Sequence, residues 1–212
     1  MELSTKLARQ WVTIGSVAGI IANLIFPVLL LVSLPSSIEI FFAGMFGVTF
    51  SLCGFGFHNF LKQEKTTVIS QIAALFVFVS GFLFTLMLVV QQVFHGYLLH
   101  FRSEVTSEKD LQLLDWIERT VDPIHLSMQI SNDFFCATAM LLFSFVMYSH
   151  SSFGKIWSIS GSLIAASLLV IKCYAFPFTP REVGIPYIIG PLVALWFLVI
   201  CLRCLNQKNK VA

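Results

Sequence analysis

Six long apolar stretches, separated by short polar segments, occupy most of the chain. Each has about the 20 residues that one helix needs to cross a bilayer core roughly 30 Å thick. The pattern predicts an all-α fold: a polytopic membrane protein whose six transmembrane helices form one bundle and a single domain over residues 1–212. The predicted spans are approximately 11–34, 38–60, 67–94, 123–148, 156–176 and 185–203.

The lysines and arginines are divided unevenly between the two sets of span ends. Eight of the 13 lie in the amino-terminal segment, at the second and fourth connections and near the carboxyl terminus, whereas four lie in the third and fifth connections. Because short loops rich in basic residues are retained in the cytoplasm, both termini are expected to be cytoplasmic. The eight residues are Lys6, Arg9, Lys62, Lys65, Lys155, Arg203, Lys208 and Lys210.

The third connection, residues 95–122, is the one long segment between spans and is expected to face outward. Ser107 can cap a helix there, and Glu108 suits the positive end of the helix dipole. Apolar residues then recur every three or four positions, which predicts an amphipathic helix on the outer surface or over the mouth of the bundle. They are Leu111, Leu114, Ile117 and Val121. Asp122 followed by Pro123 is typical of a helix start and predicts the beginning of the fourth span.

Composition agrees with a membrane protein and narrows its partners. Of all residues, 57% are hydrophobic and only 11% are charged, and the mean hydropathy is +0.86. The net charge of +2 is too small to suggest a nucleic-acid partner, so membrane lipid and a small-molecule or ion ligand are expected instead. Small residues recur along three spans and permit close helix packing within one chain or in a homo-oligomer. They are Gly15, Gly19, Gly47, Ser51, Ser158, Ser162 and Ala166.

Polar residues inside the spans form the candidate site, because each is costly in lipid unless it is partnered or hydrated. His125, Gln129 and Asp133 recur every four residues, so they form one polar stripe along the outer half of the fourth span. Lys172 lies at a similar depth in the fifth span, which makes it a candidate ion-pair partner for Asp133. The pattern predicts an outward-facing polar cavity that binds or translocates a small molecule or ion. Its predicted ligand-binding residues are Asp133, Lys172, His125, Gln129, Gln91, His95 and Asn132.

Other interpretations of the polar residues stay open. The same side chains fit a structural network that holds helices together. Histidines form two layers, His58 with His150 and His95 with His100 and His125, and such layers could ligate b-type haem. A non-catalytic accessory subunit is compatible with the short loops. An intramembrane hydrolase comes third, after the cavity and the haem interpretations, because neither HExxH nor GxSxG occurs, and an enzyme is therefore disfavoured.

Overall fold

The computed structural model of the protein describes residues 2–32, 34–64, 67–185 and 189–207. Over these residues the chain forms six α-helices and no strand, and all six are long and apolar enough to cross a membrane. The predicted all-helical fold, with six helices of membrane-spanning length, is therefore confirmed. The helices are α1 (Glu2–Leu31), α2 (Ser36–Leu61), α3 (Val68–Glu104), α4 (Glu108–Met147), α5 (Gly154–Ala175) and α6 (Ile189–Gln207). Lys65, Pro186, Lys208 and Lys210 lie outside the described residues.

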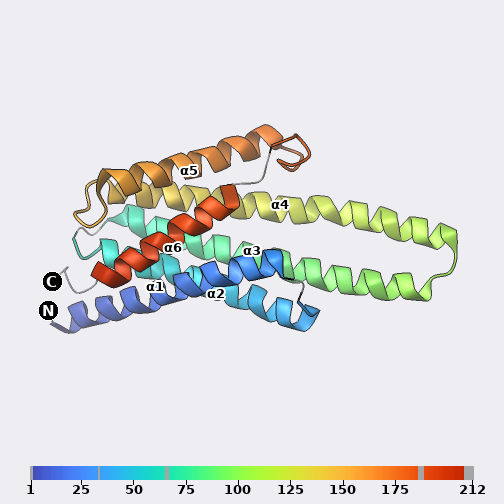
Figure 1. The fold of residues 1–212 in the computed structure, drawn as a ribbon, viewed down its shortest axis with the longest axis horizontal. Helices are drawn as coiled ribbons and strands as arrows, with labels where there is room; N and C mark the ends of the chain where they lie inside the picture. The colour runs from blue at the N-terminus through green and yellow to red at the C-terminus, as the bar shows by residue number, and fades with distance from the viewer. Residues whose placement is uncertain (1, 33, 65–66, 186–188, 208–212) are drawn as a thin grey trace.

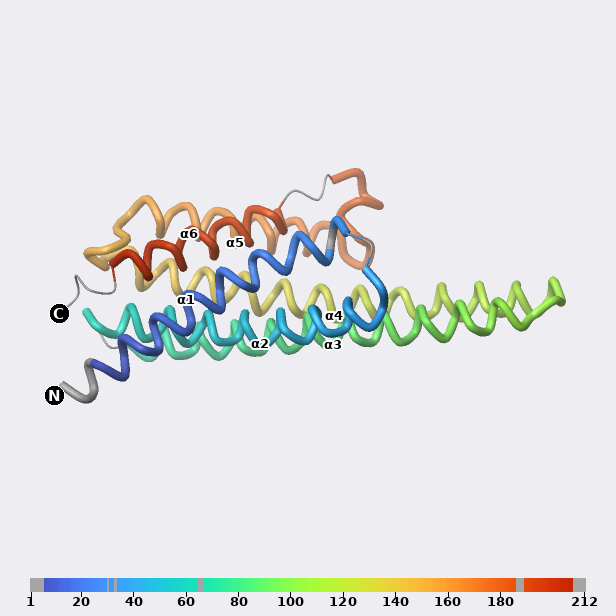
Figure 2. The backbone as a smooth tube through the Cα atoms, turned by 60° about the horizontal axis from the view of Figure 1, so that its bottom comes forward, coloured from blue at the N-terminus to red at the C-terminus, as the bar shows by residue number. Residues whose placement is uncertain are grey.

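The helices form a bundle in which neighbours along the chain pack side by side (Figure 1). α2 packs between α1 and α3, and α4 packs between α3 and α5, so the first five helices run alternately up and down. α6 returns against α1 and brings the end of the described chain close to its beginning (Figure 2). α1 therefore begins and α6 ends at the same end of the bundle, which we call the terminal end.

The interior is built from aromatic rings and from close contacts at glycine. Phe46, Phe50, Phe57 and Phe60 of α2 are all buried and pack against rings from the neighbouring helices. At Gly47 an added Cβ would meet the Gly81 carbonyl oxygen of α3 at 2.7 Å. The stripe of α1 is also used inside the bundle, where Gly15 faces Gly56 and Gly19 faces Cys53 and Cys201. In the stripe of α5, Ser158 donates to the Ser144 carbonyl oxygen, whereas Ala166 is exposed.

The structure differs from the sequence prediction over residues 95–122. In place of a loop with a separate surface helix, residues 95–104 extend α3 and residues 108–122 form the beginning of α4. α3 and α4 have 37 and 40 residues, about 55 and 60 Å at 1.5 Å per residue. They project beyond the other helices as a hairpin, which we call the arm (Figures 1 and 2). The predicted helix over 108–122 is thus present, but it runs without interruption into the fourth span.

Pro123 explains why a helix start was predicted at the beginning of the fourth span. A proline after an aspartate fits the first turn of a helix, yet Pro123 lies inside α4. The carbonyl that Pro123 deprives of a helical hydrogen bond belongs to Arg119, four residues earlier. Arg119 is exposed, so water can satisfy that carbonyl and the helix continues. α4 begins after Ser107, as predicted, but the Ser107 side chain makes no capping hydrogen bond.

Candidate functional site

A buried ion pair joins α4 to α5. Asp133 Oδ2 lies 2.6 Å from Lys172 Nζ, and both residues are buried, with exposed fractions of 8% and 2%. Each charge offsets much of the cost of removing the other from water. The contact that the sequence predicted between these two residues is therefore present.

The ion pair belongs to a polar chain that crosses three helices. Ser80 of α3 donates a hydrogen bond of 2.6 Å from its hydroxyl to Asn132 Oδ1. The amide of Asn132 donates in turn to Asp133 Oδ1 at 3.3 Å. The chain of side chains from Ser80 to Lys172 fixes the Asp133 carboxylate from both sides. Ser80 was not singled out from the sequence, because a serine in an apolar helix is common and carries no spacing signal.

A small cavity lies against this chain at the centre of the bundle. This central cavity has a volume of about 80 Å³, enough for a few water molecules or a small ion. Its wall combines aromatic rings with a polar side. The polar lining residues are Asn23, Ser80, Gln129, Asn132 and Asp133.

A second and much larger cavity lies where the arm leaves the bundle. Its volume is about 560 Å³, within the range typical of small-molecule sites. α3, α4 and the connection between α1 and α2 form its wall. We call it the arm-end cavity, and its polar lining residues are Ser36, Glu39, Gln91, Gln92, His95, Glu118, Asp122 and His125.

The structure divides the predicted site between these two cavities. Gln91, His95 and His125 line the arm-end cavity, whereas Gln129, Asn132 and Asp133 line the central one. No described residue lines both, and Lys172 lines neither but holds Asp133. His125 and Gln129 are one turn apart on α4, a rise of about 6 Å. The polar stripe is therefore real, but it borders two successive cavities in place of the single one expected.

The acidic side chains give the arm-end cavity a negative lining. Glu39, Glu118 and Asp122 border it, and no lysine or arginine is among its described lining residues. Glu118 is partly neutralised by Arg102, whose guanidinium donates to it at 2.8 Å. Glu118 was expected on a separate surface helix and Asp122 at the start of the fourth span, so neither was predicted to line the cavity.

Aromatic rings fill the bundle between the central cavity and the terminal end. The ring centres of Phe57 and Phe143 lie 4.5 Å apart, and Phe153 and Trp196 pack edge-on against Phe57. Phe197 borders the central cavity and continues this layer. This layer separates the central and arm-end cavities from the terminal end, where a third cavity of about 400 Å³ is lined in part by Glu64, Ser149 and His150.

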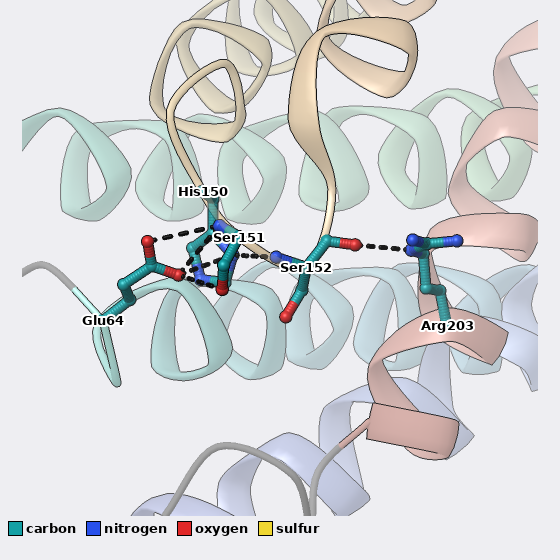
Figure 3. A network of polar contacts seen from close by, with 5 residues as sticks. All are labelled: Glu64, His150, Ser151, Ser152 and Arg203. Carbon is teal, nitrogen blue, oxygen red and sulfur yellow. Dashed lines mark hydrogen bonds and ion pairs between the residues drawn. The ribbon is translucent and has the colours of Figure 1, made fainter.

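A polar network links three segments at the terminal end (Figure 3). The Glu64 carboxylate accepts hydrogen bonds from the amide and the hydroxyl of Ser151, at 3.0 and 2.7 Å. His150 Nδ1 lies 3.2 Å from the same carboxylate and accepts from the Ser152 amide at 3.2 Å. Arg203 of α6 donates through Nε to the Ser152 carbonyl oxygen at 2.7 Å. This network joins the connection between α4 and α5 to two other segments, the connection after α2 and helix α6.

The network shifts the pKa values of its two titratable groups outside the spans. Burial lowers the pKa of His150, and the neighbouring Glu64 carboxylate offsets only part of that shift. Burial by itself would raise the pKa of Glu64. The hydrogen bonds from Ser151 and the positive charge of a protonated His150 outweigh that effect, so the pKa of Glu64 is lowered. Near neutral pH this places a neutral His150 beside an ionised Glu64.

The histidines do not form the two open layers that the haem interpretation requires. His58 is bonded through Nδ1 to Ser70 Oγ at 2.9 Å, and His150 is stacked on Phe60 in the terminal-end network. His95 and His100 are exposed on the extension of α3. Within the described part of the chain, no group of three or more histidine, cysteine, aspartate or glutamate residues is placed to hold a metal ion.

Comparison with known proteins adds no relative. No family model, no curated protein and no solved structure matches the chain.

Proposed function

We propose that the chain is an integral membrane protein that binds or translocates a small molecule or ion through the arm-end cavity. Both termini lie in the cytoplasm in this proposal, and the arm faces outward. The excess of basic residues at the terminal end supports this orientation, since basic residues at short connections stay on the cytoplasmic side. The six apolar helices support membrane insertion.

The Asp133–Lys172 ion pair is the observation that carries the proposal. The pair is buried in the apolar part of the bundle. Its aspartate, Asp133, borders the central cavity, which lies one turn of α4 below the arm-end cavity. Ionisable residues inside a membrane are rare because they are costly, and those that occur commonly mark ligand or ion pathways. Asp133 is too short to extend to the membrane surface, so its position requires a compensating partner.

The lining of the arm-end cavity favours a cation or a solute rich in hydrogen-bond donors. Carboxylates at Glu39 and Asp122 attract positive charge, and Gln91 and Gln92 can bond polar groups of either kind. A ligand admitted here meets Gln129 next and then Asp133. Transport to the cytoplasm would further require the aromatic layer around Phe57 to rearrange, whereas binding would not.

Native mass spectrometry of the purified protein tests this proposal. We expect a bound small mass on the wild-type chain that is lost on Asp133→Asn. Asp110→Asn serves as the matched control, because it removes an equal charge from the exposed arm. Equal occupancy of all three proteins, or a bare chain in all three, would contradict a site at Asp133. If Asp133→Asn alone does not fold, because it leaves Lys172 unpaired, the double variant Asp133→Asn with Lys172→Met takes its place, and an unchanged bound mass on that variant would favour the structural-network interpretation.

A haem protein is the second candidate, because His95 and His125 both border the arm-end cavity. The acidic lining opposes it, since haem carries two propionates that would meet Glu39 and Asp122. An absorption spectrum with a Soret band would favour this candidate. A bare and colourless chain would instead favour the accessory subunit.

A further inference from the structure

The contacts within the arm define which faces of its two helices meet. Arg102 of α3 donates to Asp115 and Glu118 of α4, at 2.6 and 2.8 Å. Leu98 is buried between the helices, and Phe94 lies edge-on to His125 with 6.4 Å between ring centres. These contacts form the seam of the arm.

An apolar face lies to one side of this seam on both helices. With about 100° between successive residues of a helix, Val93, Tyr97 and Phe101 fall on one side of the α3 seam. Because α4 runs antiparallel, Ile117 and Ile124 fall on the same side of the arm, with Leu113 further round the helix. All six are exposed, Tyr97 most of all at 61%. We call this set the arm face.

The opposite side of the arm borders the arm-end cavity. The same geometry places Gln91, His95 and Leu99 of α3 and Asp122 of α4 on that side, and all four are among the lining residues of the cavity. The calculated positions therefore agree with the observed cavity wall. The arm face is directed away from the ligand-binding side and away from the rest of the bundle.

Most of the arm face lies outside the predicted spans. Tyr97, Phe101, Leu113 and Ile117 fall in the connection 95–122, and Val93 and Ile124 fall at the adjoining ends of the third and fourth predicted spans. None of the six residues is charged, and Glu104 and Asp110 follow only toward the tip. Contiguous apolar patches larger than a few hundred Å² are uncommon on monomers and mark interaction sites. A hairpin of two helices is in addition marginally stable unless its remaining apolar stripe is covered.

The extent of the arm face identifies a second copy of this chain as its partner. The face continues into the spanning part of α3 through the exposed Leu86, so the partner must itself cross the membrane and project beyond it at the same side. A copy in the same membrane meets both conditions through a twofold axis along the membrane normal. The small-residue stripes of α1 and α2 do not compete for this role, because Gly15, Gly19 and Gly47 are packed within the bundle.

The arm face supplies most of the area that such an association needs. With roughly 150–250 Å² for each large apolar side chain, its six residues expose on the order of 500 Å² per copy. Two arm faces would therefore bury on the order of 1,000 Å², near the lower limit for a stable interface, and the adjoining part of α3 would add to that area. We propose that the arm face is a homodimer interface in which two arms form a four-helix bundle outside the membrane. The inference depends on the membrane orientation proposed above but not on the ligand.

Disulfide crosslinking in membranes tests the interface. Cys173 is the one exposed cysteine among the described residues, so Cys173→Ser provides the background. In that background Tyr97→Cys should form a covalent dimer on mild oxidation, because equivalent residues of the two copies meet at the axis. Leu99→Cys is the matched control: it is on the same helix and 55% exposed, but it faces the arm-end cavity. We expect it to remain monomeric.

A charged substitution provides the second measurement. Ile117→Glu alters the arm face at an exposed position outside the spans and should convert the purified protein from the mass of two chains to that of one. Leu99→Glu should leave the dimer intact. The inference is overturned if Tyr97→Cys forms no self-dimer, if Leu99→Cys crosslinks equally well, or if Ile117→Glu leaves the mass unchanged. Crosslinking of Tyr97→Cys to a different protein would overturn it as well.

Discussion

At the scale of single residues, Asp133 and Lys172 depend on each other. Each is buried, and each would leave an uncompensated charge in the interior if the other were neutralised. Breaking a buried ion pair by removing one partner typically costs 3–5 kcal/mol, whereas replacing both partners is often neutral. Single and double substitutions of the pair should therefore differ markedly in their free energies of unfolding.

We expect Lys172→Met to lower the free energy of unfolding by about 3–5 kcal/mol. The double variant Asp133→Asn with Lys172→Met should recover most of that loss, because no buried charge is left unpaired. Thermal or denaturant unfolding in one detergent measures both. Additive effects of the two substitutions would show that the pair is not coupled, contrary to the 2.6 Å contact.

His150 predicts a dependence of stability on pH. Burial lowers its pKa in the folded state, so the unfolded chain binds more protons below the ordinary histidine pKa of about 6.5. Stability should therefore be intact above that pH and fall as the pH drops from 6.5 through the lowered value. Glu64, whose folded pKa is also lowered, adds a further loss at more acidic pH.

Melting temperatures measured between about pH 7.5 and 5.5 test this dependence. The decrease should be smaller in His150→Gln than in the wild type. His100→Gln should keep the wild-type decrease, because His100 is exposed on the arm. An equal decrease in all three proteins would assign the effect to other groups.

The roles of some of these residues could be predicted from the sequence and those of others could not, for a physical reason. Asp133 and Lys172 are conspicuous because charges inside apolar helices are rare, and their spacing from the helix ends placed them at similar depth. Ser80 and Glu118 owe their roles to the packing of α3 on α4, which one sequence does not specify. The division of the polar stripe into two cavities depends on the same packing.

At the scale of helices, the lengths of α3 and α4 were the main feature that sequence reasoning missed. The three- to four-residue spacing correctly predicted that residues 108–122 are helical. It could not tell whether that helix lies on the surface or continues α4, since both arrangements have the same period. Pro123 favoured a break in the helix. The helix continues because water can bond the exposed carbonyl that the proline leaves without a helical hydrogen bond.

The contact of α2 with α3 depends on Gly47. An added Cβ there would meet the Thr85 side chain and the Gly81 carbonyl oxygen. We expect Gly47→Ala to lower the free energy of unfolding by about 1–3 kcal/mol, as overpacking of a close contact typically does. Gly44→Ala is the control, because it lies one turn away on α2 with nothing within 4 Å of its added Cβ.

The two alanine variants should differ in sign as well as in size. Alanine is favoured over glycine inside a helix by up to about 1 kcal/mol, so Gly44→Ala should be neutral or slightly stabilising in the same unfolding assay. If Gly47→Ala is no less stable than Gly44→Ala, the close approach of α2 to α3 is not essential to the bundle.

At the scale of the whole molecule, the two ends of the bundle differ in kind. An aromatic layer separates the terminal end, which has its own cavity beside Glu64 and His150, from the central cavity. The end that carries the arm contains the larger, acidic cavity and leads toward Asp133. We interpret this asymmetry as a site open to the outside and closed to the cytoplasm.

Thiol labelling from outside tests that claim most directly. In the Cys173→Ser background, His95→Cys places a thiol in the arm-end cavity and Ser149→Cys places one at the terminal end. A membrane-impermeant thiol reagent added to intact cells should label His95→Cys and leave Ser149→Cys unlabelled until the cells are permeabilised. Labelling of Ser149→Cys in intact cells, with His95→Cys protected, would contradict the outward-facing cavity.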